Sequence, residues 1–405
     1  MKFLENIKDK INLTKIDLLC IGLLLLPLNL TLAGIFFIFL LLSEIYKKKT
    51  YDLLFKLEKT NLLIFSFLFI SFIQISIAID PLLHIAGLFS HYIVYILLFL
   101  SFNKIIKNTD EIKKIIKFIC YSGFILSIIG FLAYFYIIST VKFFEYEIYG
   151  AKEYLFNFEI YNQQQKASSF NMNPNIMAIY LIITFFTTIL SKNLNIINKN
   201  PFYLISISQA LAIILTKSRG GILVFLLGLI FLFFKEKKLD KNILFFIPIF
   251  ILIFYIYWQT YEVLILSLFD INFNSNKLRL ETWNICLKII ESFPNGIGIL
   301  NYEKIYPSYI KYNQQYIPHA HNWILHTTIE SGIFASLIFF YTYFYQIYLL
   351  FKKKSYFTRQ YVIFNLILIL FFLFNLTDYV LTDTRICILL ILIIFFAFNK
   401  KIVST

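Results

Sequence analysis

The sequence predicts an all-α integral membrane protein, a polytopic helical bundle of about 12 transmembrane helices that forms a single membrane domain over residues 1–405. Of its 405 residues, 59% are hydrophobic and only 15% are charged, whereas a soluble domain carries about 25% charged residues. Uninterrupted apolar runs, such as residues 62–79, approach the roughly 20 residues that cross the hydrocarbon core. These observations exclude the soluble, disordered and fibrous classes of protein.

Apolar segments follow one another along the whole chain. The expected spans are residues 17–28, 32–45, 62–79, 84–102, 115–139, 174–190, 201–216, 220–234, 243–260, 322–351, 361–380 and 386–398. The first two spans are short and are separated by Pro27 and Asn29, so they form either a tight hairpin or two full crossings. No cleavable signal peptide is evident, because the first apolar run is followed at once by a second.

The formal net charge of +14 reports on topology. When the loops are assigned to alternate sides, most Lys and Arg residues fall on the side of the N-terminus, and short cytoplasmic loops carry such an excess. Both termini are therefore expected in the cytoplasm. The large segment 261–321, between the ninth and tenth spans, is expected on the opposite, periplasmic side.

The four cysteines are Cys20, Cys120, Cys286 and Cys387. They are far apart in the sequence, so they predict neither a disulfide framework nor a metal site with closely spaced thiolates.

Polar clusters mark the outer ends of several spans, where polar groups in a membrane protein usually have a function. In the first cluster, residues 168–181, Pro174 can begin a helix, and Asn173 or Asn175 can cap that helix or contact a ligand. In the second cluster, residues 216–221, Arg219 precedes two glycines. A helix N-terminus with a fixed cation favours a phosphate group, although an interfacial arginine explains the pattern as well.

The third cluster, residues 279–300, predicts an amphipathic helix over residues 277–292 followed by a glycine-rich turn. Arg279 and Trp283 are four residues apart and share one helix face, where the indole can stack on a sugar or a cation or can simply lie at the interface. The fourth cluster, residues 319–332, contains His319, His321 and His326. These histidines can accept a proton or cap a helix, and without cysteine or paired carboxylates at ligand spacing a zinc site is disfavoured.

Taken together, the four clusters resemble the superfamily of O-antigen ligases and O-antigen polymerases, which are bacterial membrane glycosyltransferases. The matching residues are FNMNPN at 170–175, SRGG at 218–221, Arg279 and Trp283 with PNGIG at 294–298, and His321, Asn322, Glu330 and Gly332. The resemblance implies a GT-C-like helical membrane fold with one large periplasmic loop.

The resemblance also implies a donor and a set of site residues. The donor is an undecaprenyl-diphosphate-linked glycan, used without a metal or another cofactor. His321 corresponds to the catalytic base, and Arg219 and Arg279 correspond to the residues that hold the diphosphate. The remaining substrate-binding residues expected from the matching motifs are Asn175, Trp283, His319, Asn322 and Glu330.

The function predicted on this basis is that of an O-antigen ligase in lipopolysaccharide biosynthesis. Such an enzyme transfers the glycan to a lipid A core sugar, with inversion, at the periplasmic face of the bacterial inner membrane. The alternative is an O-antigen polymerase that joins lipid-linked repeat units. A transporter is less well supported, because the polar motifs gather at helix ends rather than at the bilayer midplane. A protein O-oligosaccharyltransferase is a further, less favoured enzyme option. No nucleic-acid partner is expected, and the oligomeric state is left open.

Overall fold

The computed structural model describes residues 13–45, 59–135, 140–148, 151–159, 167–169, 172–235, 274–311, 315–352 and 359–398. The predicted ninth span, residues 243–260, lies outside the described residues. So do residues 261–273 of the predicted periplasmic segment and residues 170 and 171 of the first motif.

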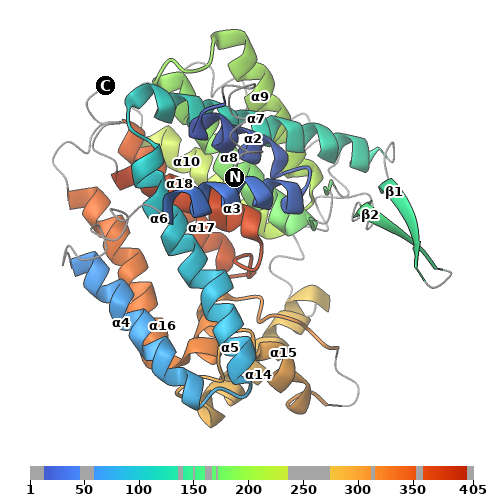
Figure 1. Cartoon of the computed structure of the whole chain (residues 1–405), viewed down its shortest axis with the longest axis vertical. Coiled ribbons are helices and arrows are strands. Elements are labelled where there is room, and N and C mark those ends of the chain that lie inside the picture. The colour runs from blue at the N-terminus through green and yellow to red at the C-terminus, as the bar shows by residue number, and fades with distance from the viewer. Residues whose placement is uncertain are drawn as a thin grey trace.

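The described chain is built mainly of helices (Figure 1). The α-helices are α2 (Lys15–Leu25), α3 (Leu30–Ile45), α4 (Lys59–Ile73), α5 (Pro81–Leu88), α6 (Val94–Ile105), α7 (Thr109–Tyr134), α8 (Pro174–Asn193), α9 (Lys199–Leu215), α10 (Arg219–Lys235), α14 (Asn274–Ser292), α15 (Tyr302–Ile305), α16 (Trp323–Lys352), α17 (Arg359–Asn375) and α18 (Thr384–Phe398). Shorter turns are η2 (Gln74–Ser76), the π-helical η3 (Phe89–Ile93) and η4 (Tyr306–Ser308).

Within the described ranges, four helices are long and apolar enough to cross a membrane, and α5, η3 and α6 count as one of them. These are Pro81–Ile105, Thr109–Tyr134, Pro174–Asn193 and Trp323–Lys352. Five further apolar helices among the described residues have 10–17 residues. The protein is therefore a helical membrane protein, and the number of spans stays a prediction.

Helix α8 lies at the centre of the main hydrophobic core. Every residue from Met177 to Ser191 is buried, as expected for a helix that is apolar on all sides. Helices α7, α9, α10, α17 and α18 pack against it. Asn173 accepts a hydrogen bond from the backbone N–H of Ile176 (2.9 Å), and Pro174 occupies the first turn. The start of α8, and with it the position of Asn175, is thus fixed by local sequence.

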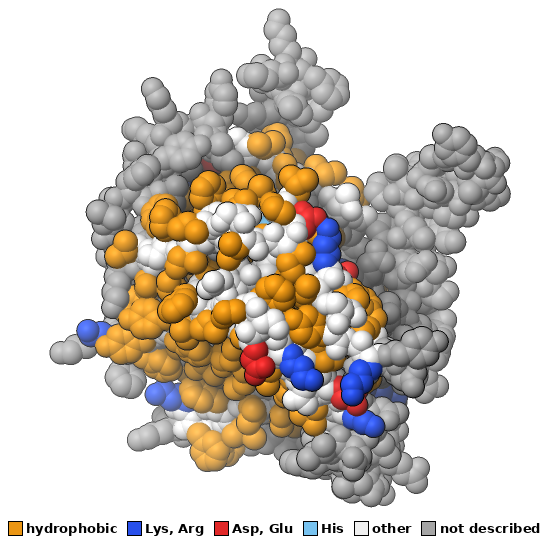
Figure 2. Space-filling view, turned by 90° about the horizontal axis from the view of Figure 1, so that it is seen from below, with side chains coloured by type: hydrophobic (Ala, Val, Ile, Leu, Met, Phe, Trp, Pro, Cys, Tyr) orange, Lys and Arg blue, Asp and Glu red, His pale blue; other side chains and the backbone are white. Residues whose placement is uncertain are grey.

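The outer surface of α16 is apolar at helical spacing. Its exposed large side chains include Phe334, Leu337, Tyr341, Phe344, Tyr348 and Phe351. Helix α4 packs against α16, and its exposed side chains include Leu62, Phe65, Phe69 and Phe72. Figure 2 shows hydrophobic side chains over much of one face of the molecule, with charged side chains in a few groups. A soluble protein rarely exposes so much contiguous apolar surface, so these stripes fit contact with lipid.

The structure adds one feature to the all-α prediction. Strands β1 (Thr140–Ile148) and β2 (Ala151–Glu159) form an antiparallel hairpin, in which Thr140 pairs with Glu159 and Ile148 with Ala151. The hairpin projects from the side of the helical body (Figure 1). The hairpin lies between the predicted fifth and sixth spans, where a search for apolar helices gives no information on strands. The predicted fifth span, residues 115–139, ends as helix α7 at Tyr134.

The segment between α14 and α16 has a small hydrophobic core of its own, which includes Cys286, Ile297, Tyr302 and Ile329. Within it, the residues Pro294–Gly298, here called the glycine loop, contact a break in α16. Gly332 has φ of +78° inside that helix. The backbone N–H groups of Ile297 and Gly298 donate to the carbonyl oxygens of Ile329 and Glu330, both at 2.9 Å. The glycine loop thus binds carbonyls of the broken helix.

The connection between α4 and α5 holds the other side of the glycine loop. Gln74 Nε2 donates to the carbonyl oxygens of Asn295 (2.9 Å) and Glu330 (2.7 Å). His84 is fully buried and accepts from the N–H of Ile299 (2.9 Å), while its other ring nitrogen lies 2.7 Å from Ser71 O. Residues before the first motif therefore support the segment that carries the third motif.

Candidate functional site

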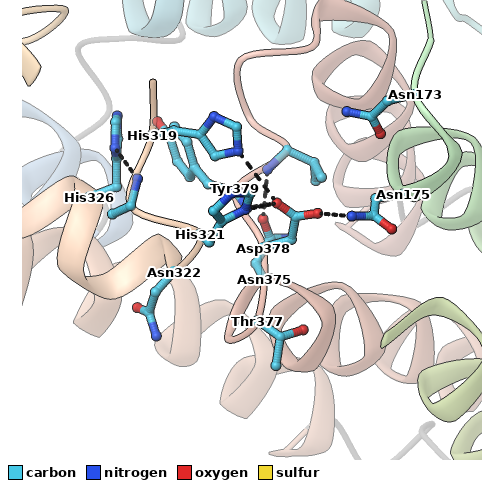
Figure 3. A network of polar contacts seen from close by, with 12 residues as sticks. Asn173, Asn175, His319, His321, Asn322, His326, Asn375, Thr377, Asp378 and Tyr379 are labelled. Atoms are coloured by element: carbon cyan, nitrogen blue, oxygen red, sulfur yellow. Dashed lines mark hydrogen bonds and ion pairs between the residues drawn. The ribbon is translucent and has the colours of Figure 1, made fainter. Parts of the chain in front are cut away.

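The carboxylate of Asp378 is the centre of a polar network formed by segments far apart in the sequence (Figure 3). Asp378 belongs to the connection between α17 and α18, residues 376–383, here called the aspartate loop. Its Oδ1 lies 3.0 Å from Nδ1 of His321 and 3.6 Å from Nε2 of His319. Its Oδ2 accepts a hydrogen bond from Nδ2 of Asn175 at 2.7 Å. The sequence analysis did not identify Asp378.

Asn175 connects the first two motifs to this carboxylate. Its amide oxygen accepts a hydrogen bond from Ser218 Oγ at 2.8 Å, and Ser218 Oγ accepts from the backbone N–H of Gly221 at 3.2 Å, in the first turn of α10. The glycines of the second motif have a packing role. A Cβ on Gly221 would lie 2.6 Å from Cβ of Ala178 in α8, and one on Gly220 would lie 3.1 Å from Thr377 Oγ1 in the aspartate loop. The SRGG motif therefore allows α10 to approach α8 and the site closely.

Hydrogen bonding fixes the ionisation state of Asp378. Burial alone would raise the pKa of its carboxyl, but the hydrogen bonds and charges of His319 and His321 outweigh burial and hold the pKa well below its ordinary value. An ionised carboxylate only accepts hydrogen bonds. Nδ1 of His321 therefore carries the proton in that bond, which in the neutral imidazole leaves the lone pair on Nε2.

His321 belongs to residues 319–322, here called the histidine loop. Its φ is +47°, an uncommon conformation for a residue with a side chain, and such strain persists only where the surroundings hold it. The holding contacts are made by its neighbour Ala320. The N–H of Ala320 donates to Nδ1 of His326 at 3.4 Å, and its carbonyl accepts from Trp283 Nε1 at 3.0 Å.

Asn322 and Glu330 stabilise this arrangement from α16. Asn322 Oδ1 caps the helix by accepting from the N–H of Leu325, and its Nδ2 donates to Leu376 O in the aspartate loop, both at 3.0 Å. Glu330 is buried, and its Oε1 lies 3.4 Å from Nε2 of His326. Both residues were predicted to bind substrate. Their contacts in the structure are with the protein framework of the site.

The two predicted diphosphate-binding arginines lie at the starts of α10 and α14. Arg219 donates from Nη2 to Asn276 Oδ1 at 3.1 Å and to Ser275 Oγ. Its guanidinium is partly buried, and burial, followed by the positive charge of Arg279, lowers its pKa. The two cations are thus close enough to repel each other, so an anion placed between them would be favourable.

His319, His321 and Asp378 also meet the distance criterion for a metal site. In the part of the chain that the structure describes, one ligand atom from each of these residues lies within 4.8 Å of the other two. A metal site was disfavoured from the sequence because no cysteine or paired carboxylate lies at ligand spacing from the histidines. Asp378 was expected inside the predicted span 361–380, whereas helix α17 ends at Asn375 and leaves Asp378 in the loop that follows. A charged residue within an apolar span was the available signal.

Comparison with known proteins identifies one family. Residues 204–340 match the sequence model of the family described as O-Antigen ligase. This region begins in α9 and includes Arg219, Arg279 and all three histidines of the fourth motif. No curated protein matches the chain.

Proposed function

We propose that this chain, a member of the O-antigen ligase-like superfamily, transfers an undecaprenyl-diphosphate-linked O-antigen glycan to a lipid A core sugar. The family supports O-antigen ligase or polymerase-type activity by a membrane glycosyltransferase, and the proposal specifies the donor and the acceptor. The observation that carries it is the pairing of His321 with the buried carboxylate of Asp378 at 3.0 Å. The helices of Arg219 and Arg279 are connected to this network, because Ser218 donates to Asn175 and Trp283 donates to Ala320 O.

In the proposed reaction, Nε2 of His321 takes the proton from an acceptor hydroxyl. The hydroxyl oxygen attacks the anomeric carbon of the glycan while the bond from that carbon to the diphosphate oxygen breaks. The configuration is inverted, and undecaprenyl diphosphate leaves with the electron pair of the broken bond. The imidazolium that forms is stabilised by Asp378, whose Oδ1 accepts from Nδ1, in the same way that a buried carboxylate orients a catalytic histidine elsewhere.

The arginines have the complementary role of balancing charge on the leaving group. A guanidinium presents a planar pair of donors that matches phosphate oxygens, and two of them supply the positive charge that a metal ion supplies in many phosphate sites. Because the diphosphate is a good leaving group, alignment of the reactants and charge balance can provide most of the catalysis. The proposed reaction is therefore metal-independent.

The donor part of the proposal is tested by Arg219→Lys and Arg279→Lys in the purified protein. Lysine keeps the charge but loses the planar fork, so each variant should raise the KM for the lipid-linked donor several-fold or more. Lys288→Arg, on the exposed side of α14, is the matched control and should behave as the wild type. Unchanged donor KM in both arginine variants would contradict the proposal.

The acceptor is tested in cells. In the proposal, the active site faces the periplasm from the inner membrane, and both chain termini are in the cytoplasm. Lipopolysaccharide would then receive its polymer from this enzyme at the periplasmic face. Deletion of the gene should remove all O-antigen from lipopolysaccharide on a gel while lipid-linked polymer accumulates. A single repeat unit on the core would instead identify a polymerase.

A further inference from the structure

We propose that His319, His321 and Asp378 form a reversible inhibitory site for a divalent transition metal such as Zn²⁺. The inhibitory effect rests on the proposed function, whereas metal binding does not. The proposal begins from two imidazoles and one carboxylate on adjoining loops, with ligand atoms within 4.8 Å of one another. Imidazole and carboxylate are common zinc ligands.

The spacing of the three groups fits one small ion. Zinc binds imidazole nitrogen and carboxylate oxygen at about 2.0–2.2 Å in tetrahedral geometry, which separates neighbouring ligand atoms by about 3.3 Å. The two nitrogen-to-oxygen distances to Asp378 Oδ1 are 3.0 Å for His321 and 3.6 Å for His319. The imidazole ring centroids are 4.3 Å apart. Small side-chain rotations are therefore enough to place all three ligands around one ion.

The exposure of the two histidine side chains and a hydrogen bond to the carboxylate also favour an ion at this site. The His319 and His321 side chains are each 25% exposed, whereas that of Asp378 is 7% exposed. An ion would thus have protein ligands on the inner side and an open position toward solvent, as in three-ligand zinc sites. Asn175 holds the second carboxylate oxygen, Oδ2, at 2.7 Å, and such an outer hydrogen bond orients a ligating carboxylate.

A metal ion on Nδ1 of His321 would prevent the ring from acting as a base, because it changes which of the two ring nitrogens carries the proton. Without metal, Nδ1 donates its proton to Asp378, and the lone pair is on Nε2. A metal on Nδ1 requires the lone pair there, so the single proton of the neutral ring moves to Nε2. His321 then cannot accept a proton from a hydroxyl.

Metal binding is tested directly on the full-length protein in detergent or nanodiscs, with Co²⁺ and Zn²⁺ as probes. We expect one Co²⁺ per protein with the strong visible absorption of a tetrahedral site, displaced by Zn²⁺. His319→Gln and Asp378→Asn should each weaken binding at least tenfold, whereas His91→Gln, a histidine outside the group, should leave it unchanged. Each variant is first confirmed as folded by its thermal transition. Absence of stoichiometric binding, or binding that survives both His319→Gln and Asp378→Asn, would overturn the site.

Inhibition is tested separately, as glycan transfer at increasing free Zn²⁺. Transfer by the wild type should fall at least tenfold over the same concentrations that displace Co²⁺, and a chelator should restore it. Activation by Zn²⁺, or unchanged transfer with the site occupied, would refute the inhibitory role while leaving the binding result in place. If the metal binds but no glycan is transferred under any condition, the proposed function fails and the metal site stands.

Discussion

The glycine loop and the histidine loop both contact α16 near its N-terminal half, but they use different atoms. The glycine loop binds through its backbone, since Ile297 and Gly298 donate to carbonyls at the break in α16. The histidine loop is held by the backbone of Ala320 and by the side chain of Asn322, and it directs the His321 ring to a buried carboxylate. The two motifs are similarly prominent in the sequence but have different roles. The glycine loop stabilises the fold at the break in α16, and the histidine loop presents the proposed catalytic side chain.

This difference predicts opposite failures when each loop is changed. Variants of the histidine loop should fold and lose turnover, whereas variants of the glycine loop should lose folded protein and keep turnover in the molecules that fold. The following predictions are ordered from the largest expected effect to the smallest.

His321→Ala should reduce glycan transfer by about 10² to 10⁴, the range typical of a lost general base. Donor binding should remain close to wild type because a base acts in the chemical step, and the protein should still fold because His319 still lies 3.6 Å from the Asp378 carboxylate. Single-turnover transfer by the purified protein measures the effect. His91→Ala is the matched control and should retain turnover. Near-normal transfer by folded His321→Ala would remove His321 from the mechanism.

Asp378→Asn should reduce turnover by about tenfold to a hundredfold. An amide supplies no negative charge to stabilise the imidazolium, and its NH₂ group can force the wrong tautomer of His321. The measurement is kcat at saturating donor. Asp80→Asn is a suitable control, because Asp80 lies in an ion pair with Lys304 that is partly exposed and such pairs contribute little. Equal losses in the two variants would indicate a general effect of removing charge.

Gly296→Ala should lower the free energy of unfolding by more than about 2 kcal/mol, through strain and steric overlap. Gly296 has φ of +85°, and a Cβ there would lie 2.2 Å from Gln74 Nε2 and 2.4 Å from the N of Gly332. The yield of folded protein should fall several-fold, while turnover per folded molecule stays within about twofold.

The control for this change is Gly34→Ala in helix α3, where a Cβ meets nothing within 4 Å. Alanine there should be neutral or stabilising by up to about 1 kcal/mol. Thermal unfolding in detergent, monitored with size-exclusion recovery, separates the two variants. A Gly296→Ala protein that is as stable as Gly34→Ala would show that the close contacts of the glycine loop are not required.

Trp283→Phe should have the smallest effect, a few-fold fall in kcat with unchanged KM. The substitution removes the hydrogen bond to Ala320 O, worth about 1 kcal/mol, and keeps an aromatic face. If Trp283 acts instead by stacking on a sugar, Phe should preserve both constants and Trp283→Leu should raise KM. The split between kcat and KM therefore decides whether Trp283 positions the histidine loop or contacts substrate.

Much of this protein was determined by the sequence itself. Long apolar runs have no alternative to helices in a bilayer, because every backbone polar group must be satisfied within the segment. The residue at which a helix begins also followed from the local sequence, as the cap Asn173 and the first-turn Pro174 show for α8. The four motifs were visible because polar residues at the ends of apolar spans stand out, and the O-antigen ligase-like resemblance is confirmed for residues 204–340. The assigned roles of individual site residues stay predictions.

Tertiary structure decided which of those residues meet, and through which atoms. Asp378 was missed because no periodicity connects residue 321 with residue 378, and only the packing of α8, α16 and α17 brings Asn175, His321 and Asp378 together. Asn322 and Glu330 stay predicted substrate-binding residues, and the structure adds the contacts that each makes with Leu376 O and His326. The β-hairpin and the break at Gly332 were also outside the reach of sequence patterns. The physical reason is the same in each case: hydrogen-bond partners distant in the sequence are selected by three-dimensional packing, which local propensity does not encode.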